Sequence, residues 1–463
     1  MDKKQKTSEN GGRRKTARVA WFAVVFCVVF FLLQFLLTPD YDAYTETGEP
    51  HLDGGRFYTK IMLHDLYTAE ENIDMLFLGS SHTYWQYIPS VIDEYLDVHS
   101  FNAGTSAQQF DGSYALLVEA GKKNKLDTVV LEVCPSRKGM VFSERTNLSQ
   151  IYIVSDYMRF SLNKIRFLLK ASEPEHYVNS FFPLLRNKQN YLDRGFVKNV
   201  IKRKLSKEYR SYSLPEESPE SEFSYVDRGY LAHRKSVENE DWQTAARYEP
   251  IKDEMFSSEE AGFLEDIAGY CKKHEIHLIL ISTPLTDFNI AQYGNYDSGR
   301  EQIARFAAEN GLEFYDFNLC RPEYFTCEST KYFDPSHMNH TGAEEYSILV
   351  GRFFSGEITE DELFYGSYEE KLQDMGNRVF GLAYTIETNE SGKTVHLEPV
   401  ASAEFPVYVN IESVSAGGTE TRIIEKELLE DLHFDKDDTG TITVEVLGDD
   451  PDGEVTNTIH IEY

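Results

Sequence analysis

The chain has little positive charge for its length. Its 463 residues include 46 Lys and Arg against 77 Asp and Glu, which gives a net charge of −31 at pH 7. Residues 1–18 hold seven of the basic side chains and only two acidic ones, so the rest of the chain carries −36. Because an acidic surface repels phosphate backbones, nucleic-acid binding is not expected, and a neutral or weakly charged substrate is slightly favoured.

Cysteine is also scarce, and its spacing limits the kinds of site to expect. The five cysteines are an odd number, and only Cys320 and Cys327 lie close enough in the sequence to suggest a loop-closing disulfide. Five unpaired and mostly buried thiols are an equally good interpretation. No spacing of histidine and cysteine resembles a zinc site, so neither a metal nor another cofactor is predicted.

Long apolar runs are absent except for one near the N-terminus, which begins at Val19 and ends at Leu37. It contains no charge, and at about 1.5 Å per residue a helix of this length spans the roughly 30 Å hydrocarbon core of a membrane. Basic residues precede the run and acidic residues follow it, which places the N-terminus in the cytoplasm and the rest outside. A cleaved signal peptide is the alternative, but the run is long for one and no clear small-x-small site follows. We therefore predict a single-pass signal anchor in the cell membrane.

Two kinds of periodicity divide the remainder of the chain. Between residues 71 and 356, all-apolar segments alternate with amphipathic helical segments, a β-α-β pattern typical of a three-layer α/β fold with a parallel sheet. From residue 375 onward, short alternating segments separated by turn residues predict a small β-sandwich-like domain. The predicted organisation is a basic cytoplasmic tail (1–18), a transmembrane signal anchor (19–38), a connector (39–70), an α/β domain (71–356) and a β domain (375–463).

An insertion at about residues 140–255 interrupts the α/β pattern. It is rich in Tyr, Phe, Arg and Lys, and its basic amphipathic segments are predicted to be helices. Such helices could cover the sheet, lie on an anionic membrane surface or bind a partner protein, and the sequence leaves these three roles open.

A serine follows the first apolar segment of the α/β pattern. Residues 73–79 read IDMLFLG and lead into Ser80, Ser81 and His82, so Ser81 is expected at the carboxyl end of a buried strand, where open α/β sheets bind ligands. A serine becomes a nucleophile when an imidazole takes its proton and a carboxylate orients that imidazole. A polar turn after a core strand is the alternative interpretation.

An acid and an imidazole occur together much later in the chain. In FDPSHMNHTG, Asp334 and His337 are three residues apart in an expected loop, so the carboxylate can accept the Nδ1–H of the ring and leave Nε2 for Ser81. His340 and His82 are competing candidates for the base. Their alternative role is that of exposed or supporting histidines.

The segment FNAGTSAQQF supplies candidates for binding an oxyanion. Gly104 lacks a Cβ, so its N–H can approach a ligand closely, and a tetrahedral oxyanion requires such a donor. Asn102 is the accompanying polar residue at the expected strand end. A plain tight turn is the alternative for both residues.

Taken in this order, GSSH, FNAG and D-x-x-H-x-N-x-x-G resemble the first, second and fifth sequence blocks of the SGNH (GDSL-like) hydrolase superfamily. The resemblance covers residues 73–354 without the insertion. It implies an SGNH-type parallel sheet in which Ser81 is the nucleophile, Asp334 and His337 complete the triad, and the N–H groups of Ser81 and Gly104 bind the oxyanion.

One block departs from the family pattern. The third block normally supplies an asparagine after the middle strand, whereas this chain reads VVLEVCPSR at that place. The second side-chain donor to the oxyanion is therefore unassigned, with Gln108 as the only candidate.

The same departure, together with the N-terminal anchor, resembles a membrane-anchored subgroup that contains the lipoteichoic-acid D-alanylation and alginate O-acetylation proteins. This resemblance implies a serine O-acyltransferase that modifies a cell-surface polysaccharide or teichoic-acid-like polymer through an acyl-serine intermediate. It also implies a membrane-bound O-acyltransferase as partner and an acylated small carrier or glycan as substrate. A carbohydrate esterase or deacetylase of the same fold is the alternative, and a non-catalytic polymer-binding protein is the third interpretation.

Overall fold

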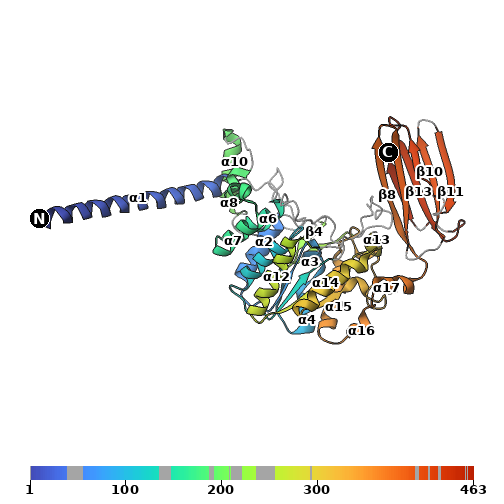
Figure 1. Ribbon diagram of the computed structural model, residues 1–463, viewed down its shortest axis with the longest axis horizontal. Helices are drawn as coiled ribbons and strands as arrows, with labels where there is room; N and C mark the ends of the chain where they lie inside the picture. Colours follow the sequence, from blue (N-terminus) through green and yellow to red (C-terminus); the bar gives the residue numbers. More distant parts are fainter. Residues whose placement is uncertain are drawn as a thin grey trace.

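The centre of the protein is a five-stranded parallel sheet, seen in a computed structural model (Figure 1). The structure describes residues 2–38, 56–134, 148–186, 192–207, 209, 222–235, 256–291, 293, 295–401, 406–415, 418–425, 429–453, 455 and 457–463. The strands, in the spatial order β2-β1-β3-β6-β7, are β2 (Ser100–Asn102), β1 (Met75–Leu78), β3 (Thr128–Glu132), β6 (His277–Ser282) and β7 (Glu313–Asp316).

Helices cover both faces of this sheet, so alternate strand residues enter different cores. Leu76 and Leu78 lie in one core, whereas Met75 and Phe77 lie in the other. The first core is covered by α2 (Arg56–Thr68), α5 (Phe110–Ala120), α12 (Ser258–Lys273) and α14 (Tyr296–Asn310), and the second by α4 (Pro89–Leu96) and α15 (His340–Phe354). Burial on both faces explains why these strands are apolar without alternation. The predicted α/β fold with a parallel sheet is confirmed.

The direction in which the chain adds strands to the sheet reverses between β1 and β3. The chain passes from β1 to β2 on one side and reaches β3 on the other, so the loops that follow β1 and β3 diverge at the carboxyl edge of the sheet. Open α/β sheets bind their ligands at such a point. Leu78 is paired with Leu131, so the residues that follow these two are neighbours in space.

The insertion separates β3 from β6. Its described elements are α6 (Leu148–Ser155), α7 (Leu162–Ala171), a 3₁₀ turn (Pro174–His176), α8 (Tyr177–Phe181), α9 (Pro183–Arg186), α10 (Arg194–Lys204) and the antiparallel pair β4 (Phe223–Tyr225) and β5 (Leu231–His233). Residues 236–255 of the predicted insertion and residues 39–55 of the predicted connector lie outside the described residues.

The N-terminal helix α1 (Asp2–Leu37) projects away from the sheet, with its C-terminal end beside α8 and α10 (Figure 1). Its segment Ala17–Leu37 is long and apolar enough to cross a membrane, and none of that segment is buried in the protein. The predicted apolar N-terminal helix is therefore present, and by length and composition it suits either an anchor or a signal sequence.

The C-terminal region contains two antiparallel sheets around a separate apolar core. Two short helices, α16 (Glu360–Leu363) and α17 (Tyr368–Met375), lead into it from α15. One sheet contains β11 (Gly418–Glu425), β10 (Tyr408–Ser415), β13 (Gly440–Gly448) and β14 (Asn457–Glu462), and the other contains β12 (Leu432–Phe434), β9 (Gly392–Ala401) and β8 (Val379–Asn389). The predicted β structure of this region is confirmed.

No disulfide joins Cys320 to Cys327, so of the two interpretations that the sequence allowed for this pair, the structure has the two thiols. Both side chains lie in the second core of the α/β domain. Burial raises the pKa of the Cys327 thiol to about 11, which keeps it protonated and unreactive near neutral pH.

Candidate active site

Ser81 is the first residue of a short helix, α3 (Ser81–Gln86), that begins almost directly after β1. Strand and helix are joined by Gly79 and Ser80. A Cβ at Gly79 would collide with the side chains of Thr83 and Glu132, so this turn accepts only glycine at its first position. The turn therefore presents Ser81 at the carboxyl end of a buried strand, where the sequence places it.

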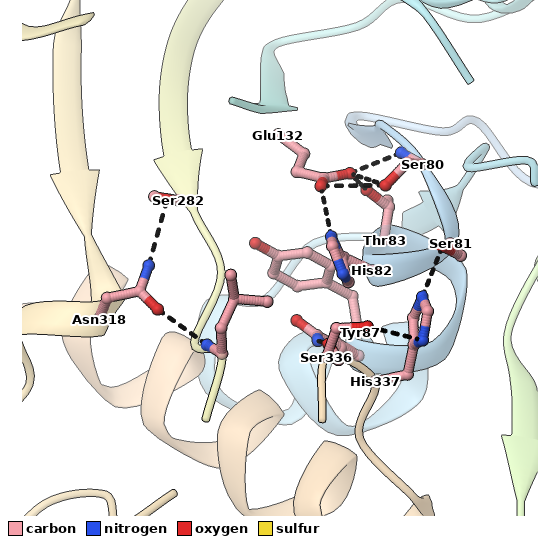
Figure 2. Close-up of polar contacts among 12 residues, drawn as sticks. Ser80, Ser81, His82, Thr83, Tyr87, Glu132, Ser282, Asn318, Ser336 and His337 are labelled. Atoms are coloured by element: carbon pink, nitrogen blue, oxygen red, sulfur yellow. Dashed lines mark hydrogen bonds and ion pairs between the residues drawn. The ribbon is translucent and has the colours of Figure 1, made fainter. Parts of the chain in front are cut away.

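Glu132, the last residue of β3, holds this turn from the neighbouring strand. Its carboxylate accepts the Ser80 N–H at 2.5 Å, the Ser80 hydroxyl at 2.9 Å and the Thr83 hydroxyl at 3.0 Å, and it lies 2.9 Å from His82 Nδ1 (Figure 2). Only 7% of Glu132 is exposed. A buried carboxylate requires several donors, and here the serine turn supplies them.

Ser81, His337 and Asp334 form a continuous chain of hydrogen bonds. Ser81 Oγ lies 2.7 Å from His337 Nε2, and His337 Nδ1 lies 2.7 Å from Asp334 Oδ2. Figure 2 shows the imidazole of His337 beneath the hydroxyl of Ser81. The geometry is that of a serine with a base in contact and a carboxylate that fixes the orientation of the base.

Aromatic rings enclose the imidazole of His337. Trp85 meets it edge-on with 4.7 Å between centroids, and Phe333 stacks on it at 5.6 Å. His233, from β5 of the insertion, stacks in turn on Phe333 at 3.7 Å. Burial lowers the pKa of His337; the hydrogen bond to Asp334 opposes this effect and the nearby His82 adds to it. The lowered pKa keeps His337 neutral near pH 7, the state that a general base requires.

The loop that carries Asp334 is arranged around its carboxylate. Oδ1 accepts the N–H of Ser336 at 2.8 Å and the N–H of His337 at 2.9 Å, which leaves Oδ2 for the imidazole. Burial alone would raise the pKa of Asp334, but the hydrogen bonds from His337 and Ser336 outweigh it and lower the pKa to about 2. Asp334 is therefore ionised over the whole range in which the imidazole titrates.

The two competing histidines contact residues other than Ser81. His340 is exposed at the start of α15, where Nδ1 is 2.9 Å from the hydroxyl of Tyr230. His82 is tied to Glu132 by Nδ1, and its ring lies 4.8 Å from the ring of His337. Of the three histidines considered, His337 is the one placed at the Ser81 hydroxyl.

The oxyanion role of Asn102 and Gly104 stays a prediction, and in this structure both residues are hydrogen-bonded within the protein. The N–H of Gly104 donates to Asn102 Oδ1 at 3.1 Å, so this donor is already engaged. The amide nitrogen of Asn102 donates to the carbonyls of Thr83 and Tyr87 at 2.7 and 3.0 Å, which ties β2 to α3. Gly104 is needed for a different reason, because a Cβ there would lie 2.9 Å from the carbonyl oxygen of Ser80.

Gln108, the third residue predicted at the oxyanion site, is also hydrogen-bonded within the protein. Its Nε2 donates to the hydroxyl of Ser113 at 3.0 Å and its Oε1 accepts from the hydroxyl of Thr105 at 2.8 Å. These contacts tie the buried amide of Gln108 to the loop before α5 and to the start of that helix. Within the described part of the chain, the N–H of Ser81 is the predicted oxyanion donor that has no hydrogen-bond partner.

Glu132 is the residue that sequence reasoning missed. A signal for it was present: a single carboxylate closes the otherwise apolar strand TVVLE, at the edge of the sheet where Ser81 was expected.

Among the described residues there is no cluster of three His, Cys, Asp or Glu side chains that could hold a metal ion.

Comparison with known proteins gives distant similarities only. No family model matches the chain, and no curated protein matches it. A solved structure described as a lipolytic protein of the G-D-S-L family from Desulfitobacterium hafniense DCB-2 is 10% identical, with a TM-score of 0.28 over 61% of this chain and 99% of that one. A two-domain esterase active on acetylated mannans is 12% identical, with a TM-score of 0.26 over 88% of this chain and 94% of that one. At these scores neither likeness identifies a function, so the chemistry must be inferred from the side chains at the carboxyl edge of the sheet.

Proposed function

We propose that this protein is a serine esterase or acyltransferase of the SGNH type that forms an acyl-serine at Ser81. The observation that carries the proposal is the chain of two 2.7 Å contacts from Ser81 through His337 to Asp334, located at the carboxyl edge of the sheet where the strand order reverses between β1 and β3. Residues from distant parts of the sequence meet there in the order that nucleophilic catalysis requires.

The first half-reaction follows from this geometry. Ser81 Oγ attacks the acyl carbonyl while its proton passes to His337 Nε2, and the tetrahedral oxyanion is held by donors that include the Ser81 N–H. The collapse of this intermediate breaks the ester bond, and the proton on Nε2 goes to the departing alkoxide. Asp334 remains ionised and stabilises the imidazolium during both steps.

The second half-reaction sets the class of enzyme. We propose that an acceptor hydroxyl of an extracytoplasmic polymer takes the acyl group from Ser81, with His337 as its base. Support for transfer comes from the apolar helix α1, which would keep the site at the membrane surface. A membrane-bound O-acyltransferase could there deliver acyl groups from an acylated carrier. The acceptor would be a cell-surface polysaccharide or a teichoic-acid-like polymer.

An esterase that removes acyl groups from a glycan is the second candidate. Ser81 is only partly buried, so water can reach an acyl group attached to it. Transfer and hydrolysis share the acyl-serine and differ only in the nucleophile that resolves it.

Labelling and deletion separate these candidates. A fluorophosphonate probe should modify Ser81 in the wild-type protein and in a Ser355→Ala control, in which an exposed serine of the same domain is removed. The Ser81→Ala variant should remain unlabelled, and a folded Ser81→Ala protein that still reacts would overturn the proposal. Deletion of the gene should lower the ester-linked acyl content of the surface polymer if the protein is a transferase, and raise it if the protein is an esterase.

A further inference from the structure

Exposed apolar side chains are concentrated on the helices of the insertion. Nine large apolar side chains are exposed among the described residues from 56 to 377, and seven of them lie between residues 148 and 207. Phe160 and Leu162 expose 76% and 73% of their surface, and Leu192 exposes 92%. Single exposed apolar residues are ordinary on a soluble protein, but a concentration of this kind marks an interaction surface.

The same helices are basic in an otherwise acidic protein. The described residues between 148 and 207 include eleven Lys and Arg against four Asp and Glu, whereas the whole chain carries −31. On α10, the exposed Arg194, Lys198 and Lys202 border a shallow hollow lined by Val197 and Ile201. Basic and apolar side chains therefore lie next to one another on α10, so a lipid headgroup and the apolar boundary beneath it can both contact this helix.

Helices α8 and α10 lie beside the C-terminal end of the apolar helix α1 (Figure 1). Gln34, the only strongly polar residue of the apolar run, donates its Nε2 to the carbonyl of Phe181 at 3.2 Å. The ring of Phe31 lies 6.3 Å from that of Phe160. Because a helix rises about 1.5 Å per residue, Phe31 is roughly 9 Å below Leu37 along α1. The contacts with the insertion thus lie inside the end of the segment that is long enough to span a membrane.

We propose that α7 to α10 form a membrane-seated platform around the end of α1. Phe160 and Leu162 enter the boundary between headgroups and acyl chains, and the basic side chains of α10 contact anionic lipid headgroups. The inferred depth matches the roughly 5–10 Å to which interfacial helices are buried. The proposal rests on α1 being an anchor, which is part of the proposed function.

The platform is connected to the Ser81 site by the insertion itself. The pair β4 and β5 belongs to the same insertion, and His233 of β5 stacks on Phe333, which in turn stacks on His337. Seating of the insertion on the bilayer would therefore fix the height and orientation of the Ser81 site relative to the membrane.

Quenching of tryptophan fluorescence by brominated lipid tests the apolar part of the proposal. The full-length protein is reconstituted into vesicles of phosphatidylcholine and phosphatidylglycerol with brominated acyl chains. In a Trp21→Phe background, Leu162→Trp is compared with Ile423→Trp, a matched control at an exposed apolar position on β11. Quenching is expected at position 162 and not at position 423. Leu192→Trp serves as the second position if Leu162→Trp fails to fold.

The native Trp21 separates the failure of the platform from the failure of the anchor. Trp21 lies in α1, so quenching that is lost in Trp21→Phe reports insertion of that helix. Quenching of Trp21 without quenching at positions 162 and 192 would overturn the platform proposal but leave the anchor intact. The exposed apolar side chains of the insertion would then be assigned to a contact with a protein partner. Absence of quenching at Trp21 would overturn both.

The charged part of the proposal needs its own comparison. A Lys198→Gln/Lys202→Gln variant should show weaker quenching at position 162 in vesicles that contain phosphatidylglycerol. A Lys272→Gln/Lys273→Gln variant removes two exposed charges from the end of α12 and should leave the signal unchanged. Equal quenching in pure phosphatidylcholine and in mixed vesicles would contradict a role for anionic headgroups.

Discussion

At the scale of single residues, two carboxylates position different parts of the site. Asp334 holds the imidazole of His337 through Nδ1, and Glu132 holds the turn that presents Ser81. Because the two carboxylates contact different partners, their replacement should have different effects on stability and on turnover.

Replacement of Ser81 or His337 should abolish turnover without unfolding the protein. Ser81→Ala and His337→Ala should each lower kcat/KM for a chromogenic acetate by about 10⁴- to 10⁶-fold, and the double variant should be scarcely worse, because nucleophile and base act as a unit. Asp334→Asn should cost the same or less. His340→Ala should keep most activity, since that ring contacts Tyr230. Melting temperatures check that each variant is folded, and an active Ser81→Ala protein would refute the assignment.

Replacement of Glu132 by Gln should weaken both stability and turnover. The amide can keep its oxygen at the Ser80 N–H and the Thr83 hydroxyl, but its N–H₂ group then replaces the oxygen that contacts His82 Nδ1 and the Ser80 hydroxyl, and the charge that strengthens all of these hydrogen bonds is lost. Loss of these hydrogen bonds should lower the free energy of unfolding by about 1–3 kcal/mol, and the misplaced Ser81 should lower kcat by roughly 10²-fold. Urea unfolding and steady-state kinetics measure the two effects. Glu344→Gln, on the exposed side of α15, should change the stability by less than ~0.5 kcal/mol.

The pH dependence should report the lowered pKa of His337. The base acts in its neutral form, which is lost as the pH falls through its pKa. Because that pKa lies below 6.5, kcat/KM should stay level down to mildly acidic pH before it declines. His82→Gln removes a neighbour that lowers the pKa of His337, so the decline should move to higher pH. A wild-type profile that declines above pH 6.5 would contradict this assignment.

The sequence indicated some of these residues and not others for a physical reason. Ser81 could be predicted because it follows a strand, and Asp334 with His337 because their spacing is local. Glu132 acts through the pairing of β3 with β1, which no local pattern encodes. Gly104 was assigned from its lack of a Cβ and from the FNAG resemblance, whereas the side chain that accepts from its N–H is visible only in three dimensions.

At the scale of elements, the site depends on the close approach of β2 to α3. Asn102 of β2 donates to two carbonyls of the α3 region, and Gly104 lies against Ser80 and Thr83. The long apolar strands and amphipathic helices were predictable from their periodicity. The six-residue α3 was not, because a helix this short has little periodicity and depends on tertiary contacts.

Gly104→Ala should therefore disturb the serine turn. The new Cβ would lie 2.8 Å from the Cβ of Thr83 and 2.9 Å from the carbonyl oxygen of Ser80, so backbone or side chain must move. We expect a loss of about 1–3 kcal/mol in stability and a reduced kcat. Gly262→Ala in α12 meets nothing within 4 Å and should instead stabilise the helix by ~0.5–1 kcal/mol. Chemical denaturation compares the two, and equal stability changes would argue against tight packing at Gly104.

At the scale of the whole molecule, the contacts between α1 and the insertion connect the N-terminus to the α/β domain. Gln34 reaches Phe181, and the rings of Phe30 and Phe182 meet edge-on at 5.3 Å. A helix removed after secretion would leave these partners exposed, which favours retention.

The protein isolated from membranes should therefore keep α1. Intact mass and N-terminal sequencing of membrane-extracted protein should show no cleavage between residues 20 and 50. A mature chain that begins after Leu37 would show that α1 is a signal sequence. Leu205→Ala, at an exposed position of the insertion, serves as a control that should not alter the processing.

The position of the insertion also sets the order in which the sheet can assemble. β3 and β6 are neighbours in the sheet, yet 144 residues lie between Glu132 and His277. At about 5–20 residues per second, the ribosome needs on the order of 10–30 s to make that stretch. During this interval β2, β1 and β3 can pair, but the apolar edge of β3 has no neighbour. The nascent chain therefore carries an aggregation-prone strand edge until β6 is made. Chaperones that bind this edge should have their largest effect in that interval.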